Sequence, residues 1–335
     1  MTATLVTLAD IQAAAARIRD VVVRTPLTDV SAGHAVGDRL QAIGDRRGGP
    51  SCPPFTIALK CEHLQPMGAF KLRGASNFLL QLSRAERAAG VITYSSGNHG
   101  QAVALAAQRL GVPAVVVMPE TAPAVKVAGV RRYGGEVLFA GTTSVDRRTR
   151  AEVEAAARGL TIVPPFDHPW IIAGAGTCGL EIVEQREALS AVYVPVGGGG
   201  LISGIAAAIT QTRPQVRVIG VEPMGAAKMS ASRAAGRPVT LERSSSIADG
   251  LLPLRPGDLT FAHVQAYVDD LVTVTDESIV DAMRWLHQAG IIAEPSGAAS
   301  VAAVLQAGPP DPPGTVAVIS GGNISAEDHA RYLAS

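Results

Sequence analysis

One lysine in this chain lies where a reactive amine would be useful. The 335 residues include 29 lysines and arginines, of which only four are lysines, and Lys71 lies in the run HLQPMGAFKLRGASN between Gly68 and Gly74. A primary amine can lose its proton and form a Schiff base with a carbonyl, whereas a guanidinium stays charged. Lys71 is therefore a candidate nucleophile, although drift in composition explains the scarcity of lysine equally well.

A run of four glycines joins two apolar segments. Gly197, Gly198, Gly199 and Gly200 lie in VPVGGGGLISGIAAAI. Glycines between a strand and a helix let consecutive backbone amides point into one concavity, and the helix dipole adds positive potential there. We favour a phosphate cradle over a flexible linker, because linkers are not usually flanked by a buried strand and a buried helix. The run is not a nucleotide P-loop, since no Lys-Ser or Lys-Thr follows the glycines.

A second loop carries polar side chains at the start of an expected helix. Ser95, Ser96, Gly97, Asn98 and His99 lie in YSSGNHGQAVALAA. Backbone amides at a helix N-terminus bind carboxylates, but Ser and Asn are also the residues preferred for capping a helix. Taken alone, this loop favours an ordinary capping turn, and His99 favours a structural role.

Two further loops each offer a single side chain. Ser320 ends the run VAVIS before two glycines, where its hydroxyl can share a hydrogen bond with a heteroaromatic nitrogen; a plain turn fits as well. Glu294 precedes a proline in IIAEPSGAAS, and an acidic residue near a helix N-terminus is ordinary. Neither residue indicates a function by itself.

Short β-branched runs alternate with longer helical patterns, which predicts an α/β fold of parallel sheets covered by helices on both faces. The expected strands are 56–60, 91–94, 114–118, 136–139, 191–196, 216–221, 270–274 and 315–320. The expected helices begin near Ala69, Asn98, Thr121, Ser144, Gly176, Gly200, Asp276 and Ser296. Such sheets bind ligands at the carboxyl ends of their strands, in loops like those described above.

Composition limits the class of protein. Lysines plus arginines equal aspartates plus glutamates at 29 each, so no basic field points to nucleic acid or to an anionic membrane. The N-terminal segment has the pattern of neither a signal peptide nor a membrane anchor. Three cysteines without a CxxC pair suggest a reducing, cytoplasmic location. We expect two domains, a small one at 78–160 inserted in a large one formed by 1–77 and 161–335.

In chain order, the loops offer an amine, a carboxylate cradle, a phosphate cradle and a hydroxyl. Pyridoxal 5′-phosphate (PLP), an aromatic phosphate with an aldehyde, would use all four. The chain resembles the fold-type II PLP enzymes, specifically the threonine/serine dehydratase and serine racemase group, through GAFKLRGA, SSGNHGQA, VPVGGGGLISG, EPSGA and SGGN in that order. The resemblance covers 24–323 and implies a two-domain, three-layer fold like that of the tryptophan synthase β subunit.

The resemblance also implies how the cofactor binds. Lys71 would carry its Schiff base, Asn98 would bond its ring hydroxyl, and Ser320 would face its pyridine nitrogen. A neutral serine leaves that nitrogen largely unprotonated, which favours elimination over chemistry that needs a long-lived carbanion. The implied cofactor-binding residues are Phe70, Lys71, Asn98, Gly197, Gly198, Gly199, Gly200, Glu294 and Ser320.

For the substrate, the resemblance implies an amino acid whose carboxylate binds Ser95–Gly97 together with Asn98 and His99. Lys71 would act as the base, and the product would lose ammonia to give a 2-oxo acid. Ser96 would lie on the opposite face of the ring, where racemising members carry a serine. The apolar segment ADGLLPL replaces a hydroxylated pair of the racemase-like members, which favours threonine.

One position departs from the metal-dependent members of the group. Those members bind a divalent cation with a glutamate, a backbone carbonyl and an aspartate; here Glu222 and Ala226 match, but Lys228 replaces the aspartate. An ammonium cannot ligate a metal ion. We therefore expect no metal and interpret Lys228 as supplying the positive charge itself, although a solvated surface lysine fits equally well.

The sequence thus predicts a PLP-dependent threonine/serine ammonia-lyase that acts on a small-molecule substrate and, by resemblance, forms a homodimer. Within the group, an amino acid racemase, a dehydratase of 3-hydroxyaspartate or phenylserine, and a β-replacement synthase remain open. In another class, a non-catalytic protein that binds a phosphate ligand also remains open, because a fold alone does not settle function.

Overall fold

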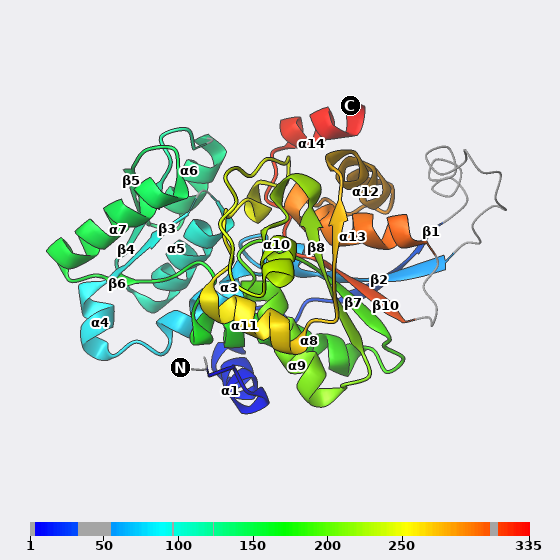
Figure 1. The fold of residues 1–335 in the computed structure, drawn as a ribbon. Helices are drawn as coiled ribbons and strands as arrows, with labels where there is room; N and C mark the ends of the chain where they lie inside the picture. The colour runs from blue at the N-terminus through cyan, green and yellow to red at the C-terminus, as the bar shows by residue number, and fades with distance from the viewer. Residues whose placement is uncertain (1–3, 33–54, 96, 123, 309–313) are drawn as a thin grey trace.

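The computed structural model describes residues 4–32, 55–95, 97–122, 124–308 and 314–335. Its strands form two sheets, which lie side by side with the smaller one on the left of Figure 1. The strands are β1 (Leu27–Ala32), β2 (Phe55–Cys61), β3 (Val91–Tyr94), β4 (Ala114–Met118), β5 (Glu136–Phe139), β6 (Thr161–Ile162), β7 (Ala191–Pro195), β8 (Arg217–Pro223), β9 (Asp270–Val274) and β10 (Thr315–Ile319).

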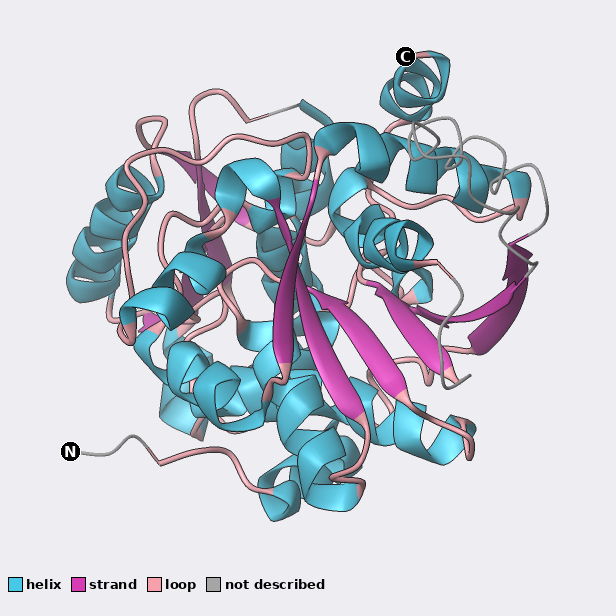
Figure 2. Cartoon of the chain, turned by 45° about the vertical axis from the view of Figure 1, so that its right-hand side comes forward, coloured by secondary structure: helices cyan, strands magenta, loops and turns pink. Residues whose placement is uncertain are grey.

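Helices surround both sheets (Figure 2). The α-helices are α1 (Leu8–Ile18), α3 (Lys71–Leu79), α4 (Arg84–Ala89), α5 (Asn98–Leu110), α6 (Ala124–Arg132), α7 (Ser144–Arg158), α8 (Pro169–Gln185), α9 (Gly200–Thr212), α10 (Lys228–Ala235), α11 (Asp258–Tyr267), α12 (Asp276–Gln288), α13 (Pro295–Ala307) and α14 (Ala326–Ala334). Three short 3-10 turns are η1 (Glu62–Leu64), η2 (Met224–Ala226) and η3 (Asp249–Leu251).

The larger sheet has the strand order β1-β2-β10-β7-β8-β9, and all its neighbouring strands are parallel except β1 and β2. Alternate side chains of a strand point to opposite faces. Accordingly, Ala317 and Ile319 of β10 pack with α12 and α13, while Val316 and Val318 pack with α8 and α9. Apolar burial on both faces explains why these strands read as continuous apolar runs.

The smaller sheet has the order β5-β4-β3-β6 and is parallel throughout. Helix α7 covers one face, and α5 and α6 cover the other. Helix α3 packs against both α5 and α8, so it lies between the helical layers of the two sheets. Because Lys71 is the first residue of α3, this packing holds its backbone at the junction of the sheets.

The predicted α/β class is confirmed, with corrections to several elements. The helices α4, α11 and α14 were not predicted. The edge strand β1 runs antiparallel to β2. It was not predicted, because its polar Thr28, Asp29 and Ser31 break the apolar pattern of a buried parallel strand. The two-residue strand β6 was also not predicted. The prediction that a helix begins near Gly176 was wrong: α8 begins at Pro169, where His168 caps the backbone N–H of Trp170.

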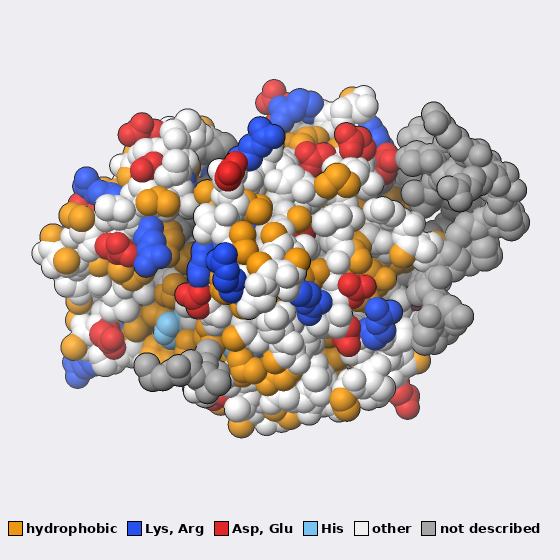
Figure 3. Space-filling view, viewed as in Figure 1, with side chains coloured by type: hydrophobic (Ala, Val, Ile, Leu, Met, Phe, Trp, Pro, Cys, Tyr) orange, Lys and Arg blue, Asp and Glu red, His pale blue; other side chains and the backbone are white. Residues whose placement is uncertain are grey.

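The domain division at 77/78 and 160/161 stays a prediction. On the face shown in Figure 3, Lys and Arg side chains are interspersed with Asp and Glu side chains. Among the described residues, no helix combines the length and the apolar character needed to cross a membrane.

Candidate active site

A cavity of about 640 Å³ lies between loops that leave the two sheets. It is lined by every predicted site residue that the structure describes: Phe70, Lys71, Ser95, Gly97, Asn98, His99, Gly197, Gly198, Gly199, Gly200, Glu294 and Ser320. Ser96 lies outside the described residues, so its predicted role stays a prediction. Residues predicted from separate motifs therefore meet in one place, as the rule for the carboxyl ends of parallel strands requires.

The amine of Lys71 is prepared for nucleophilic chemistry by its burial. Its Nζ donates a hydrogen bond to the carbonyl oxygen of Pro165 (2.7 Å) and lies 5.1 Å from the centroid of the Phe70 ring. Burial disfavours the charged ammonium and lowers the pKa of Lys71 to about 8. A substantial fraction of the amine is therefore neutral near physiological pH.

The glycine loop leaves no room for side chains. It joins β7 to the N-terminus of α9, and Gly199 has φ +98°, a conformation that favours glycine. A Cβ on Gly198 would lie 2.3 Å from the Phe166 ring, and one on Gly197 would lie 2.9 Å from the carbonyl oxygen of Gly250. Bare backbone at the start of a 13-residue helix suits a phosphate group.

Asn98, which lines the cavity, is held by hydrogen bonds to two other segments of the chain. Its Nδ2 donates to Glu294 Oε1 (2.6 Å), while its Oδ1 accepts from Asn323 Nδ2 (2.9 Å). The Asn323 amide also donates to the carbonyl oxygen of Met67 (2.8 Å). The structure thus contradicts the capping interpretation of this loop, because the N-cap of α5 is Gly97 and has no side-chain cap.

Two buried titratable side chains of the site, His99 and Glu294, are mostly uncharged at physiological pH. Burial, reinforced by the charge of Lys71, lowers the pKa of His99 to about 3. Its Nε2 lies 3.2 Å from the carbonyl oxygen of Val163, so Nε2 carries the proton as the donor. Burial, together with the nearby carboxylate of Asp249, raises the pKa of Glu294 to about 8.

Ser320 follows the last residue of β10 and is buried, and its Oγ lies 3.4 Å from the carbonyl oxygen of Ser296. Ser95 Oγ accepts a hydrogen bond from the backbone N–H of Gly97 (3.1 Å), which shapes the turn before α5. Their predicted contacts with the cofactor nitrogen and the substrate carboxylate stay predictions.

Three features of the site were not predicted from the sequence. Lys126 of α6 forms an ion pair with Asp249 of η3 and so joins the two sides of the cavity. Phe166 packs against the glycine loop, and Asn323 orients Asn98. Only Asn323 could have been found from the sequence, because it is the asparagine of the SGGN motif. The contacts of Lys126 and Phe166 depend on the packing of distant segments.

A buried charge network supports the helix that carries Lys71. Arg73 is fully buried and donates both Nε and Nη2 to the carboxylate of Glu62 (2.7 Å each). Its guanidinium also donates to both oxygens of Glu181 (2.7 and 2.8 Å), and Lys60 Nζ donates to one of them (2.5 Å). Two cations thus balance two carboxylates beneath the first turn of α3.

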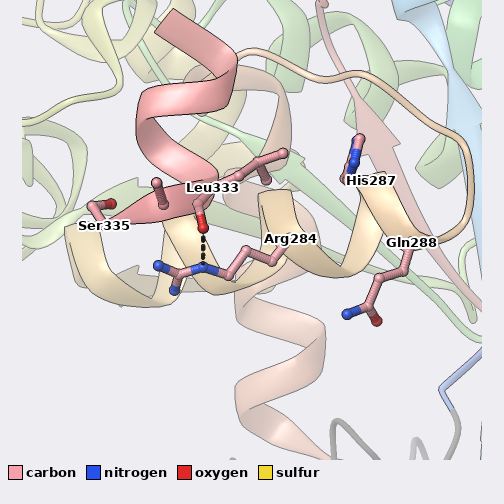
Figure 4. Close-up of a pocket in the computed structure, with 6 residues that line it drawn as sticks. Arg284, His287, Gln288, Leu333 and Ser335 are labelled. Carbon is pink, nitrogen blue, oxygen red and sulfur yellow. Dashed lines mark hydrogen bonds between the residues drawn. The ribbon is translucent and has the colours of Figure 1, made fainter.

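A second hollow, of about 590 Å³, lies at the C-terminal helix and is lined by Arg284, His287, Gln288 and residues 333–335. Arg284 Nε donates to the carbonyl oxygen of Leu333 (3.2 Å), as Figure 4 shows. None of the predicted site residues lines this hollow. Among the described residues, no group of three or more His, Cys, Asp and Glu side chains could hold a metal ion.

Comparison with known proteins identifies relatives along most of the chain. Residues 39–322 match the family described as pyridoxal-phosphate dependent enzyme. An L-threonine ammonia-lyase of Thermotoga maritima is 42% identical over 330 residues, 98% of this chain and 78% of that protein. A biosynthetic L-threonine dehydratase of Pasteurella multocida is 40% identical over 85% of this chain, which spans about half (53%) of its length. The structure of maize serine racemase has a TM-score of 0.85 at 34% identity, covering 99% of this chain and 98% of that one.

Proposed function

The chain belongs to the pyridoxal-phosphate-dependent enzymes, and from that membership we propose that it is an ammonia-lyase that converts L-threonine, L-serine or both to a 2-oxo acid and ammonia. The observation that carries the proposal is that one cavity is lined both by the amine of Lys71, whose pKa is lowered by desolvation, and by the glycine loop. A protein that only bound a phosphate ligand would have no use for a desolvated amine there.

The residues of the cavity fit PLP. When bound, PLP supplies an aldehyde for condensation with an amine and an electron sink for the pair left by a departing proton. The backbone amides of Gly197 to Gly200 would hold its phosphate, and Asn98 and Ser320 would contact its ring. Lys71 offers the only kind of side chain that can both condense with the aldehyde and later act as a base.

In the proposed reaction, the amine of Lys71 would be the base that takes the α-proton of the bound substrate. The β-hydroxyl leaves with a proton as water. Hydrolysis of the released unsaturated amino acid consumes one water and yields the 2-oxo acid and ammonia. The N-terminus of α5 would bind the α-carboxylate through backbone N–H groups of its first turn and through the Ser95 hydroxyl, while the uncharged His99, whose Nε2 proton is donated to Val163, would line the site.

Racemisation is the second candidate function, because the maize protein that shares this fold at 34% identity is a serine racemase. It would need an acid on the ring face opposite Lys71, the role proposed for Ser96. Dehydration of 3-hydroxyaspartate or phenylserine is a further candidate within the ammonia-lyase class.

One experiment separates these candidates. The purified protein is incubated with L-threonine, L-serine, 3-hydroxyaspartate and phenylserine, and 2-oxo acid and enantiomer composition are measured. We expect 2-oxo acid from threonine, serine or both. Exchange of enantiomers without 2-oxo acid would overturn the ammonia-lyase proposal, and a colourless protein that forms no borohydride-stable adduct with PLP would favour the non-catalytic class.

Three further statements belong to the proposal: cytoplasmic location, a homodimer, and a small domain at 78–160. The resemblance to the fold-type II group supports the homodimer. The pairing of β3, β4 and β5 in one sheet supports the small domain, but the fourth strand of that sheet, β6 (Thr161–Ile162), lies just beyond the predicted boundary at 160. Sedimentation analysis of the holoenzyme tests the dimer.

The reaction of Lys71 with PLP should depend on pH. Only the neutral amine attacks, so the rate of Schiff-base formation in cofactor-free protein should rise with pH and level off above about 8, the pKa of Lys71. Below that value, each pH unit should lower the rate about tenfold. Stopped-flow absorbance measures the rate. A rate that still rises steeply above pH 9 would indicate a lysine with its ordinary pKa of 10.5.

The glycine loop should not tolerate a single added methyl group. In Gly198→Ala the new Cβ would meet the Phe166 ring at 2.3 Å, so the loop or the ring must shift, and we expect the dissociation constant of PLP to rise about tenfold. Gly159→Ala is the control, because Gly159 has φ +67° but no atom near its Cβ position. It should cost about 1 kcal/mol of stability and leave PLP affinity unchanged. If both variants bind PLP with equal affinity, the proposal that the glycine loop binds the phosphate is wrong.

A further inference from the structure

The side-chain nitrogen of Lys228 lies in a closed cage of oxygen atoms. Its Nζ donates hydrogen bonds to the carbonyl oxygens of Val196 (2.8 Å), Ala226 (3.0 Å) and Leu251 (3.0 Å), and it lies 3.1 Å from Glu222 Oε1. Lys228 and Glu222 are both 0% exposed, so the interpretation of Lys228 as a solvated surface lysine is wrong. These four oxygen acceptors around Nζ indicate that Lys228 is a protonated ammonium group, which has three hydrogens to donate.

The cage joins three segments that shape the glycine loop. Val196 directly precedes Gly197. Leu251 directly follows Gly250, whose carbonyl oxygen would lie 2.9 Å from a Cβ on Gly197. The third segment holds Ala226 and leads into α10, where the methyl group of Met229 packs against Gly199. Releasing the cation would therefore free the backbone on both sides of the phosphate cradle.

A divalent cation does not fit this place. Hard cations bind sets of oxygen atoms, but here the ammonium of Lys228 already occupies the centre of the set. The carboxylate of Glu222 is also fully used, since it accepts hydrogen bonds from the backbone N–H groups of Met229 (2.8 Å) and Ser230 (2.8 Å) and from the Ser230 hydroxyl (2.7 Å). No step of the proposed reaction passes through a metal ion.

We propose that the ammonium of Lys228 is the built-in structural cation of the phosphate-binding loop, occupying the place of a divalent metal ion. Its role is positioning: it holds the backbone of Val196 and Leu251 so that the glycine amides converge. The inference rests on the proposed binding of PLP, and it predicts a protein that needs no added metal to retain its cofactor.

The first test is removal of metal. Treating the holoenzyme with a strong chelator should leave PLP retention, melting temperature and threonine deamination unchanged. A loss of PLP that magnesium restores would overturn the proposal. Absence of deamination in protein that retains PLP both before and after chelation would instead count against the proposed function, because Lys228 is intact in both samples.

The second test is chemical rescue. Lys228→Ala leaves the oxygen cage without its cation, so PLP should dissociate about tenfold faster or more, as expected when one partner of a buried ion pair is removed. Ammonium chloride should restore PLP retention, because the free ion fits where the side-chain ammonium was. Choline chloride, whose cation is too large for the cage, controls for ionic strength.

Lys228→Met is the matched control, since its uncharged side chain fills the space and blocks the added ion. It should lose PLP as fast as Lys228→Ala and show no rescue. Wild-type PLP retention in Lys228→Met, or no effect of ammonium on Lys228→Ala, would overturn the proposal. If Lys228→Ala folds only with ammonium, the proposal is supported, and equal failure to fold with and without ammonium overturns it.

Discussion

Replacing Lys71 with alanine is expected to abolish the covalent attachment of PLP and to lower turnover by at least about 10³-fold, because proton transfer by a positioned base alone contributes about 10²–10⁴-fold. Borohydride reduction of the wild-type holoenzyme should fix the cofactor on the peptide that contains Lys71, as mass spectrometry of the digest would show. The Lys71→Ala protein should yield no such peptide.

Lys126→Ala is the matched control for this prediction. Lys126 is the other lysine that lines the cavity, and its amine is engaged by Asp249 rather than left free to react. The variant should still give the reduced adduct on Lys71, whatever happens to its kinetics. An adduct that persists in Lys71→Ala and disappears in Lys126→Ala would assign the nucleophile to Lys126.

The inner strands could be predicted from the sequence because burial on both faces leaves a continuous apolar run. The inner strands at 91–94 and 114–118 begin and end as predicted, and so do the partly buried edge strands at 136–139 and 270–274. The edge strand β1 escaped prediction because Thr28, Asp29 and Ser31 interrupt its apolar residues. Sequence order also hides the pairing of β10 with β2 and β7, which brings SGGN beside the lysine loop.

The site was predictable as a set of loops but not as a set of contacts. Asn98 and Glu294 are 196 positions apart, and only the packing of the two sheets brings the amide to the carboxylate. The raised pKa of Glu294 has the same origin, because it comes from burial and from Asp249 on another segment. The surroundings of Lys228 depend equally on the fold, since three carbonyl groups of separate loops define them.

Replacing Arg73 with methionine is expected to have the largest effect on stability. It would leave the buried Glu62 and the partly buried Glu181 with only Lys60 to balance them, and breaking a buried ion pair in this way costs about 3–5 kcal/mol. Chemical unfolding followed by circular dichroism measures the loss. Arg148→Ala is the control: its i,i+4 ion pair with Glu152 is exposed, with side chains 65% and 49% accessible, and should contribute under about 0.5 kcal/mol.

The pH dependence of this loss identifies its cause. Burial alone would raise the pKa of Glu62, but the charge and hydrogen bonds of Arg73 lower it overall. In the wild type, Glu62 therefore stabilises the fold above its unfolded pKa, and this contribution is lost as the pH falls through its lower folded pKa. In Arg73→Met the carboxylate of Glu62 is buried without Arg73 and favours its protonated form. The loss in the free energy of unfolding relative to the wild type should therefore shrink as the pH is lowered. A deficit that does not change with pH would indicate lost packing rather than an uncompensated charge beneath the helix that carries Lys71.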